Sequence, residues 1–203
     1  MGILAGAVSA RRYHVVGEIE PGWREKFREA LDEYAFRDPA IEQGKEELEG
    51  WVSAHNLLDA TFADTSQWLY NEWAVFALRV DKKSLPARLV SATVQKRAQA
   101  WCKERGVEKC PTAIKRQLKE DLEKEWLART LPRVATTECA WNIVEKRMLL
   151  HTLSEKQADR FRTRFLRTFG LKLIAWSPLD DLGDVDLREA LISGSPTPLG
   201  RIS

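Results

Sequence analysis

The sequence predicts an α+β fold, with an antiparallel or mixed sheet, packed helices and a helical hairpin excursion. Three observations predict it. Strand-like and helix-like segments follow in the order strand, helix, strand, strand, helical hairpin, strand, strand, helix, strand. A continuous apolar run covers residues 73–80, which is typical of a central strand covered on both faces. Two long amphipathic segments lie between Pro86 and Leu131.

Length and composition predict one well-packed domain. The chain has 203 residues, of which 44% are hydrophobic, and it contains eight Trp, a residue that is rare in disordered segments. We expect a single domain over residues 1–178. Residues 179–203 are rich in Pro, Gly, Ser and Asp and predict a loose tail, with one turn near Leu187–Ile192.

The first half of the chain alternates between strand and helix patterns. Apolar side chains alternate over 13–19, which indicates a first strand. After Pro21-Gly22, apolar residues recur every three or four positions over 23–34, which places them on one face of a helix. Residues 50–52 form a short strand-like segment entered through a glycine, and the apolar run over 73–80 follows it.

The helical hairpin is predicted over about residues 86–131. Pro86 suits the first position of a helix, Gly106 suits its end, and a second helix follows Pro111. Each helix carries one apolar stripe, formed by Val90, Val94, Ala98 and Trp101 and by Ile114, Leu118, Leu122 and Trp126. The short linker between the helices predicts that they pack as a hairpin.

The last part of the domain predicts a β-hairpin, a helix and a final strand. Residues 133–143 and 147–153 alternate as strands. Ser154 and Gln157 form a capping-box pattern, and the helix that they begin ends at Gly170. Residues 171–176 indicate a last strand, which is apolar on both faces.

The sequence contains no segment that predicts a membrane span, a secretory signal or a cofactor site. No stretch approaches the roughly 20 apolar residues that a span requires. Three Cys without paired spacing fit reduced thiols, so we expect a cytoplasmic protein. The three His lack metal-ligand spacing and no Gly-rich phosphate loop occurs, so we expect no metal and no cofactor.

The charges are distributed unevenly, although the net charge is only +2. Residues 18–64 contain 5 Lys and Arg against 13 Asp and Glu, whereas residues 96–172 contain 19 against 10. A basic body favours a polyanionic partner such as a nucleic acid. The alternative is a mixed, solvated surface without a specific partner.

Cations on the predicted helices are the candidate DNA contacts. In the helix that begins at Ser154, four cations fall in one sector of the helical wheel, a spacing that matches successive phosphates. A second cluster surrounds Pro132, and the hairpin helices carry further cations on their outer faces. The predicted contacts are Lys96, Arg97, Lys115, Arg116, Lys119, Arg129, Arg133, Lys156, Arg160, Arg164 and Arg167.

Two other functions compete with DNA binding. Asp81 and Lys83 follow a buried strand, and such a pair serves a metal-dependent nuclease if another acid, such as Asp59 or Asp64, converges on the ion. The alternative for this pair is a charged turn, so we predict no catalytic residue. An acidic N-terminal region also fits a protein-interaction adaptor, phage- or defence-linked, that docks a basic partner.

Several short motifs, taken in order, resemble the RdgC family of recombination-associated bacterial proteins. They are Gly50-Trp51-Val52, residues 77–86, residues 115–132, Trp141, Ser154-Glu155-Lys156 and Phe169-Gly170-Leu171, and the resemblance covers about residues 10–178. The family binds DNA without strong sequence preference. The resemblance implies a homodimer that closes into a ring around duplex DNA and restrains RecA-promoted strand exchange. Duplex DNA is therefore the favoured partner, single-stranded DNA the alternative, and the nucleoid the expected location.

Overall fold

The computed structural model describes residues 2–4, 8–37, 47–183 and 185–194. The strands are β1 (Arg11–Val16), β2 (Glu47–Ser53), β3 (Leu69–Tyr70), β4 (Trp73–Lys82), β5 (Arg133–Asn142), β6 (Arg147–Leu150) and β7 (Lys172–Ala175). The α-helices are α1 (Trp23–Glu33), α2 (Ala87–Arg105), α3 (Thr112–Arg129), α4 (Glu155–Phe169) and α5 (Val185–Ser193). Short 3₁₀ helices cover Thr65–Gln67 and Pro178–Asp181.

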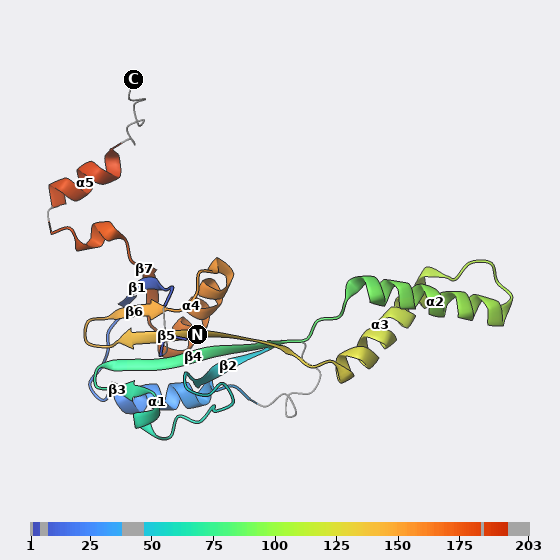
Figure 1. Cartoon of the computed structure of the whole chain (residues 1–203), viewed down its shortest axis with the longest axis horizontal. Coiled ribbons are helices and arrows are strands. Elements are labelled where there is room, and N and C mark those ends of the chain that lie inside the picture. Colours follow the sequence, from blue (N-terminus) through green and yellow to red (C-terminus); the bar gives the residue numbers. More distant parts are fainter. Residues whose placement is uncertain (1, 5–7, 38–46, 184, 195–203) are drawn as a thin grey trace.

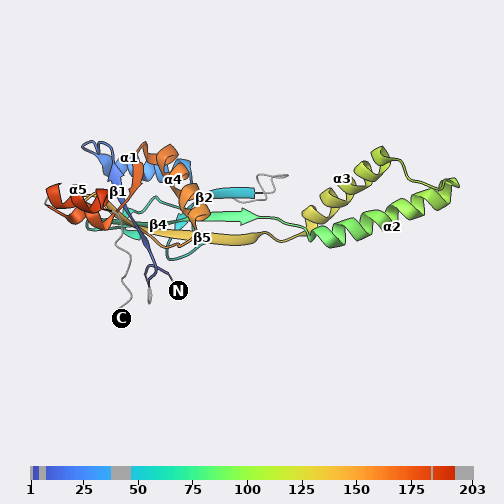
Figure 2. The same ribbon diagram turned by 90° about the horizontal axis from the view of Figure 1, so that it is seen from above.

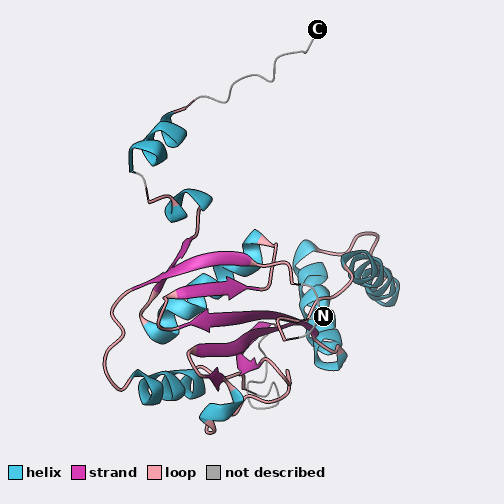
Figure 3. Ribbon diagram, turned by 60° about the vertical axis from the view of Figure 1, so that its left-hand side comes forward, coloured by secondary structure: helices cyan, strands magenta, loops and turns pink. Residues whose placement is uncertain are grey.

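The strands form one seven-stranded antiparallel sheet (Figure 3). Its order is β2-β4-β5-β6-β1-β7, and the short β3 also pairs with β4. The predicted α+β fold is therefore confirmed. Of the two predicted sheet types, antiparallel and mixed, the sheet is antiparallel. Helices α1 and α4 lie on the same side of this sheet (Figure 2).

An aromatic core fills the space between the sheet and these two helices. Trp51 and Trp141 from the sheet are fully buried, as are Phe161 and Phe165 from α4. Ring pairs in this cluster lie 4.8–6.3 Å apart between centroids, the range in which aromatic rings attract each other. The Trp51 indole Nε1 donates a 2.9 Å hydrogen bond to Thr168 Oγ1, so burial of this polar atom is compensated.

Gly50 allows the segment after α1 to approach β2 closely. A parallel bridge joins Ala35 to Trp51, and the Phe36 backbone N–H donates to the Trp51 carbonyl at 2.9 Å. A Cβ on Gly50 would collide with the backbone of Phe36. The glycine at the entry to this predicted strand is therefore required by a close backbone approach.

The other face of the sheet is only partly covered. Near β2 and β4, Phe36, Val52 and Ala77 form a small buried cluster. At the opposite edge, β7 buries Leu173 but leaves 53% of Ile174 exposed. The predicted last strand is thus present, but its second apolar face is open to solvent because no described helix packs there.

The hairpin of α2 and α3 projects away from the sheet as a continuation of β4 and β5 (Figures 1 and 2). Gly106 ends helix α2 as predicted, in the left-handed conformation. Pro86 was predicted as the first helical residue, but it is the extended N-cap, and the helix begins at Ala87. Val90, Ala98 and Leu122 are buried where the helices contact each other. The rest of both predicted apolar stripes is half-buried.

The region after β7 contains more helix than the single predicted turn. Residues 178–181 form a 3₁₀ turn with a complete capping box between Ser177 and Asp180. Helix α5 follows, and it buries none of its residues. Residues 195–203 of the predicted tail lie outside the described residues.

Candidate nucleic-acid interface

The cations of the hairpin are partly neutralised by acids on α3. Arg97 of α2 donates a 2.9 Å hydrogen bond to Glu125, which ties the two helices together and holds the pKa of the Glu125 carboxyl below its usual value. Arg129 lies 3.8 Å from the same carboxylate. Within α3, Arg116 and Lys119 each approach an acid one turn later, at 3.8 and 3.6 Å.

These exposed pairs remain available to a polyanion. Ion pairs between solvent-exposed side chains contribute little to the free energy of folding, so a phosphate can replace the acid at small cost. Lys96 and Lys115 are exposed, and neither has a carboxylate partner among the described residues. All six predicted hairpin cations are therefore exposed or half-buried, although several lie beside Glu side chains.

The neck between the sheet and the hairpin gathers cations from three elements. The strand register places Lys82 of β4 beside Arg133 of β5. Lys83 follows β4, and its Nζ donates to the carbonyl oxygen of Leu127 at 2.9 Å. A hollow of about 540 Å³ opens here, and its lining includes Lys82, Lys83 and Lys119, with Glu123 as its acid. We call this hollow, together with Arg129 and Arg133 beside it, the neck.

The predicted stripe on α4 does not lie on an open surface along its whole length. Arg160 pairs with Glu47 and lies 3.7 Å from Glu49 on β2. Arg164 donates a 3.0 Å hydrogen bond to the Glu49 carbonyl oxygen, and only 14% of its side chain is exposed. The helical spacing was predicted correctly, but both arginines brace α4 against β2 because two acids of that strand face them.

Lys156 and Arg167 are the two members of the stripe that remain open. Both side chains are exposed, and neither has an acid partner among the described residues. They are separated by 11 positions, or about 16 Å along a helix at 1.5 Å per residue. These two residues are still candidate phosphate contacts, whereas a continuous row of four is excluded by the contacts of Arg160 and Arg164.

The carboxylates considered for a nuclease are each held by local partners. Arg79 donates to both oxygens of Asp81, at 2.7 and 2.6 Å, and Asp81 is 2% exposed. Asp59 accepts from the Thr61 backbone and hydroxyl, which lowers the pKa of its carboxyl. Asp64 caps the turn at Ser66 with a 2.9 Å bond. In the part of the chain that the structure describes, no group of three His, Cys, Asp or Glu is arranged to hold a metal ion.

The sequence reasoning missed one group of cations and aromatic residues on the open face of the sheet. Arg12, Trp73, Arg147 and Trp176 come from four separate segments and line one hollow. No local pattern marks them, because only the register of the strands brings them together. The sequence offered one weak signal, which is that Trp73 and Trp176 stand at the ends of predicted strands.

The fold and these surfaces define a class of protein: an α+β sheet domain that extends a cation-bearing helical hairpin. The chain belongs to the RdgC family. Residues 10–178 match the family model described as "Putative exonuclease, RdgC", and membership implies a recombination-associated function. Comparison with the curated proteins found none that matches the chain. Among the described helices, none is both long and apolar enough to cross a membrane.

Proposed function

We propose that this protein binds DNA without sequence specificity and modulates homologous recombination by occupying duplex DNA, thereby restraining RecA-type strand exchange. The observation that carries the proposal is the neck, where Lys82, Lys83 and Lys119 line a concave surface in a member of a recombination-associated family. Lysines and arginines that contact phosphates provide most of the affinity in sequence-independent binding. Action as a homodimer on the nucleoid in the cytoplasm belongs to the same proposal.

The neck also fits a duplex better than it fits a small ligand. Its hollow opens at the base of the hairpin, lined by residues of α2, α3 and the segment from Lys82 to Leu85. Exposed cations continue along α3, which extends away from the sheet (Figure 1). Arg129 is exposed over 80% of its side chain, so it can reach a phosphate without giving up a buried position. A duplex can match such an extended row of cations, since its negatively charged phosphates repeat along the whole double helix.

The test is binding of the intact protein to a labelled duplex, measured by fluorescence anisotropy at about 50 mM and about 200 mM salt. The variant combines Lys119→Gln, Arg129→Gln and Arg133→Gln. We expect weaker binding and a salt slope reduced by about 0.9 for each phosphate that the variant no longer neutralises. A matched control combines Arg24→Gln, Lys26→Gln and Arg28→Gln on α1, which lies away from the neck (Figure 1).

Four results would contradict the proposal in different ways. Equal affinity and slope for the neck variant and the control would show that the neck does not contact DNA. No binding to any nucleic acid at low salt would favour the adaptor function, part of whose acidic region falls on residues 38–46, outside the described residues. Degradation of labelled DNA with Mg²⁺ or Mn²⁺ would favour a nuclease. A mass of about 23 kDa in solution, one chain, would contradict the homodimer.

A further inference from the structure

We infer that the open face of the sheet holds a second nucleic-acid site, at which bases of single-stranded DNA stack on Trp73 and Trp176 while Arg12 and Arg147 bind the phosphates. The inference rests on the proposed DNA-binding function. It differs from the neck in position, in residues and in the form of DNA that is bound. We call the hollow that these four residues line the sheet-face site.

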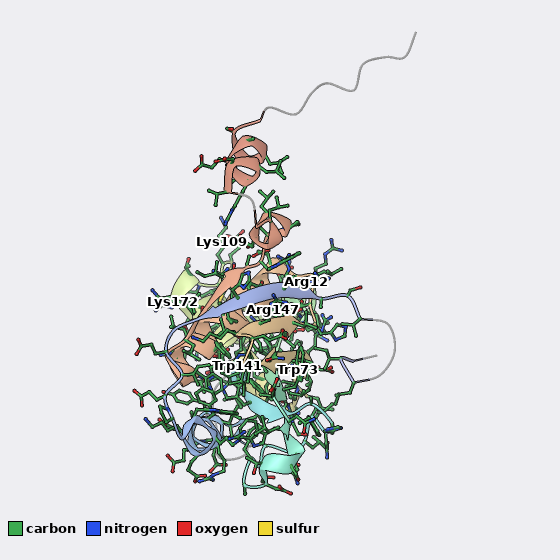
Figure 4. The ribbon with its side chains drawn as sticks, turned by 90° about the vertical axis from the view of Figure 1, so that its left-hand side faces the viewer. Arg12, Trp73, Lys109, Trp141, Arg147 and Lys172 are labelled. Atoms are coloured by element: carbon green, nitrogen blue, oxygen red, sulfur yellow. The ribbon has the colours of Figure 1, made fainter. Side chains whose placement is uncertain are left out.

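The strand register places the four side chains on one face. Trp73 lies opposite Asn142 on β5, Asn142 lies opposite Arg147 on β6, and Arg147 lies opposite His14 on β1. In the next row, Leu149 lies opposite Arg12, and the Trp176 backbone N–H donates to the Arg12 carbonyl oxygen at 2.9 Å. Figure 4 shows Arg12, Trp73 and Arg147 close together at the end of the sheet away from the hairpin.

The hollow suits a flat aromatic ligand. Its volume is about 300 Å³, at the small end of the range for ligand pockets, and Leu149 and Met148 contribute apolar surface to it. Trp73 is 37% exposed, whereas Trp51, Trp68 and Trp141 are fully buried in the core. A large aromatic ring that remains accessible beside arginines is typical of base-stacking surfaces on open sheets.

The two arginines are accessible to an anionic backbone. The Arg12 guanidinium lies over the Trp176 ring at 4.8 Å, which holds it in place. No carboxylate pairs with Arg12 among the described residues. Arg147 approaches Glu145 only at 3.8 Å, and both of these side chains are more than half exposed, so the pair is weak. Two accessible arginines beside the rings outnumber the one acid that lines the hollow, Glu145, and so favour a phosphate chain over a neutral ligand.

An unpaired strand fits this site better than a duplex does. Stacking requires access to the face of a base, and a duplex covers both faces of every internal base pair. Neighbouring strands of a sheet lie about 4.8 Å apart, so successive side chains in one row can contact successive splayed bases. The sheet-face site would therefore engage the displaced or unpaired strand of a recombination substrate.

The experiment compares an oligothymidylate with a duplex of equal length, both by fluorescence anisotropy with the intact protein. For Trp73→Ala we expect single-strand affinity to fall by between about fivefold and a hundredfold, the usual contribution of one stacked base, with duplex affinity unchanged. Trp73→Phe keeps an aromatic face and should retain most of the affinity. Arg147→Gln should weaken single-strand binding and reduce its salt slope by about 0.7.

Arg12→Gln should likewise weaken single-strand binding. Its matched control is Arg24→Gln, because Arg24 also lies over a tryptophan, Trp23 at 4.7 Å, but does not line this hollow. An oligonucleotide that carries 5-iodouracil provides a second measurement, since photo-crosslinks should map to Trp73 or Trp176. Unchanged single-strand binding in Trp73→Ala and Arg147→Gln would overturn the inference, and so would an equal loss on both substrates. If the protein binds duplex but no oligothymidylate, only this inference fails; if it binds neither, the proposed function fails too.

Discussion

Arg164 lies between α4 and β2, with 14% of its side chain exposed. Its guanidinium donates to the Glu49 carbonyl oxygen at 3.0 Å, lies 3.5 Å from the Glu49 carboxylate and stacks on the Tyr34 ring at 5.2 Å. A largely buried charge with these partners stabilises the position of α4 on the sheet. Removing the Arg164 side chain would also leave the Glu49 carboxylate without its nearest buried cation.

Replacing Arg164 with Ala should therefore destabilise the fold. Hydrogen bonds to charged groups contribute about 1.5–3 kcal/mol, so we expect a loss of about 2–3 kcal/mol in the free energy of unfolding, measured by urea denaturation. The control is Arg167→Ala, an exposed position on the same helix, which should change stability by less than about 0.5 kcal/mol. Equal stability of the two variants would show that Arg164 does not brace the helix.

Glu47 makes stability depend on pH. Its hydrogen bond with Lys82, and then that with Arg160, hold the pKa of its carboxyl below the usual value. A lowered folded pKa contributes stability above the unfolded value of about 4.3, and this stability is lost as pH falls through the folded pKa. Glu47→Gln should therefore cost less than about 1 kcal/mol at pH 7, with the difference from wild type vanishing in acid. A constant difference from pH 7 to pH 3 in urea denaturation would contradict this account.

The hairpin is an element with its own small interior. Figures 1 and 2 show it standing clear of the sheet, so its stability depends on the packing of α2 against α3. Leu122 is fully buried between these helices, and the Arg97–Glu125 hydrogen bond joins them. An element that packs mainly on itself can open without unfolding the rest of the protein.

Leu122→Ala should loosen the hairpin selectively. A cavity at a fully buried leucine lowers the free energy of unfolding by about 2–5 kcal/mol. Because the hairpin has few buried residues to compensate, we expect this loss to open it. Hydrogen exchange should then rise over residues 87–129 and stay unchanged in β4, β5 and α4. The control is Leu89→Ala, since Leu89 lies on α2 with 55% of its surface exposed. A uniform rise across sheet and hairpin would show that the two parts unfold as one unit.

At the scale of the whole molecule, two candidate surfaces lie at different ends of the sheet. The neck is where the hairpin leaves β4 and β5, and the sheet-face site is at the other end of the sheet (Figures 1 and 4). A protein that holds a duplex at one surface and an unpaired strand at the other would compete with strand exchange at its DNA substrates. No binding to the recombinase itself is needed for that competition.

Pre-incubating the duplex with this protein should slow RecA-promoted strand exchange. The neck variant of Lys119, Arg129 and Arg133 should need about tenfold more protein for the same inhibition, which corresponds to about 1.4 kcal/mol of binding free energy. The α1 variant of Arg24, Lys26 and Arg28 should inhibit as the wild type does. Full inhibition by the neck variant would indicate that the protein acts through RecA and not through the DNA.

The positions of the helices and strands could be predicted from the sequence because their signals are local. Gly106 and Gly170 end their helices through their own backbone preferences, and each lies where it was predicted. Pro86 also marks a helix end, but one position outside the prediction, as the N-cap instead of the first helical residue. The Ser154 hydroxyl likewise accepts the Gln157 backbone N–H, at 3.5 Å. The Gln157 side chain itself turns to Thr152 at 2.6 Å instead of completing the capping box, an outcome that depends on the loop before the helix.

The sequence by itself determined the elements, their order and the family motifs, since periodicity and caps act within a few residues. Only the tertiary structure decided which cations are free. Arg160 and Arg164 carry the same charge as Arg167, but Glu47 and Glu49, more than 110 positions away, face the first two and not the third. The sheet-face site likewise depends on strand register, because a shift by one residue would turn Trp73 and Arg147 to the opposite face.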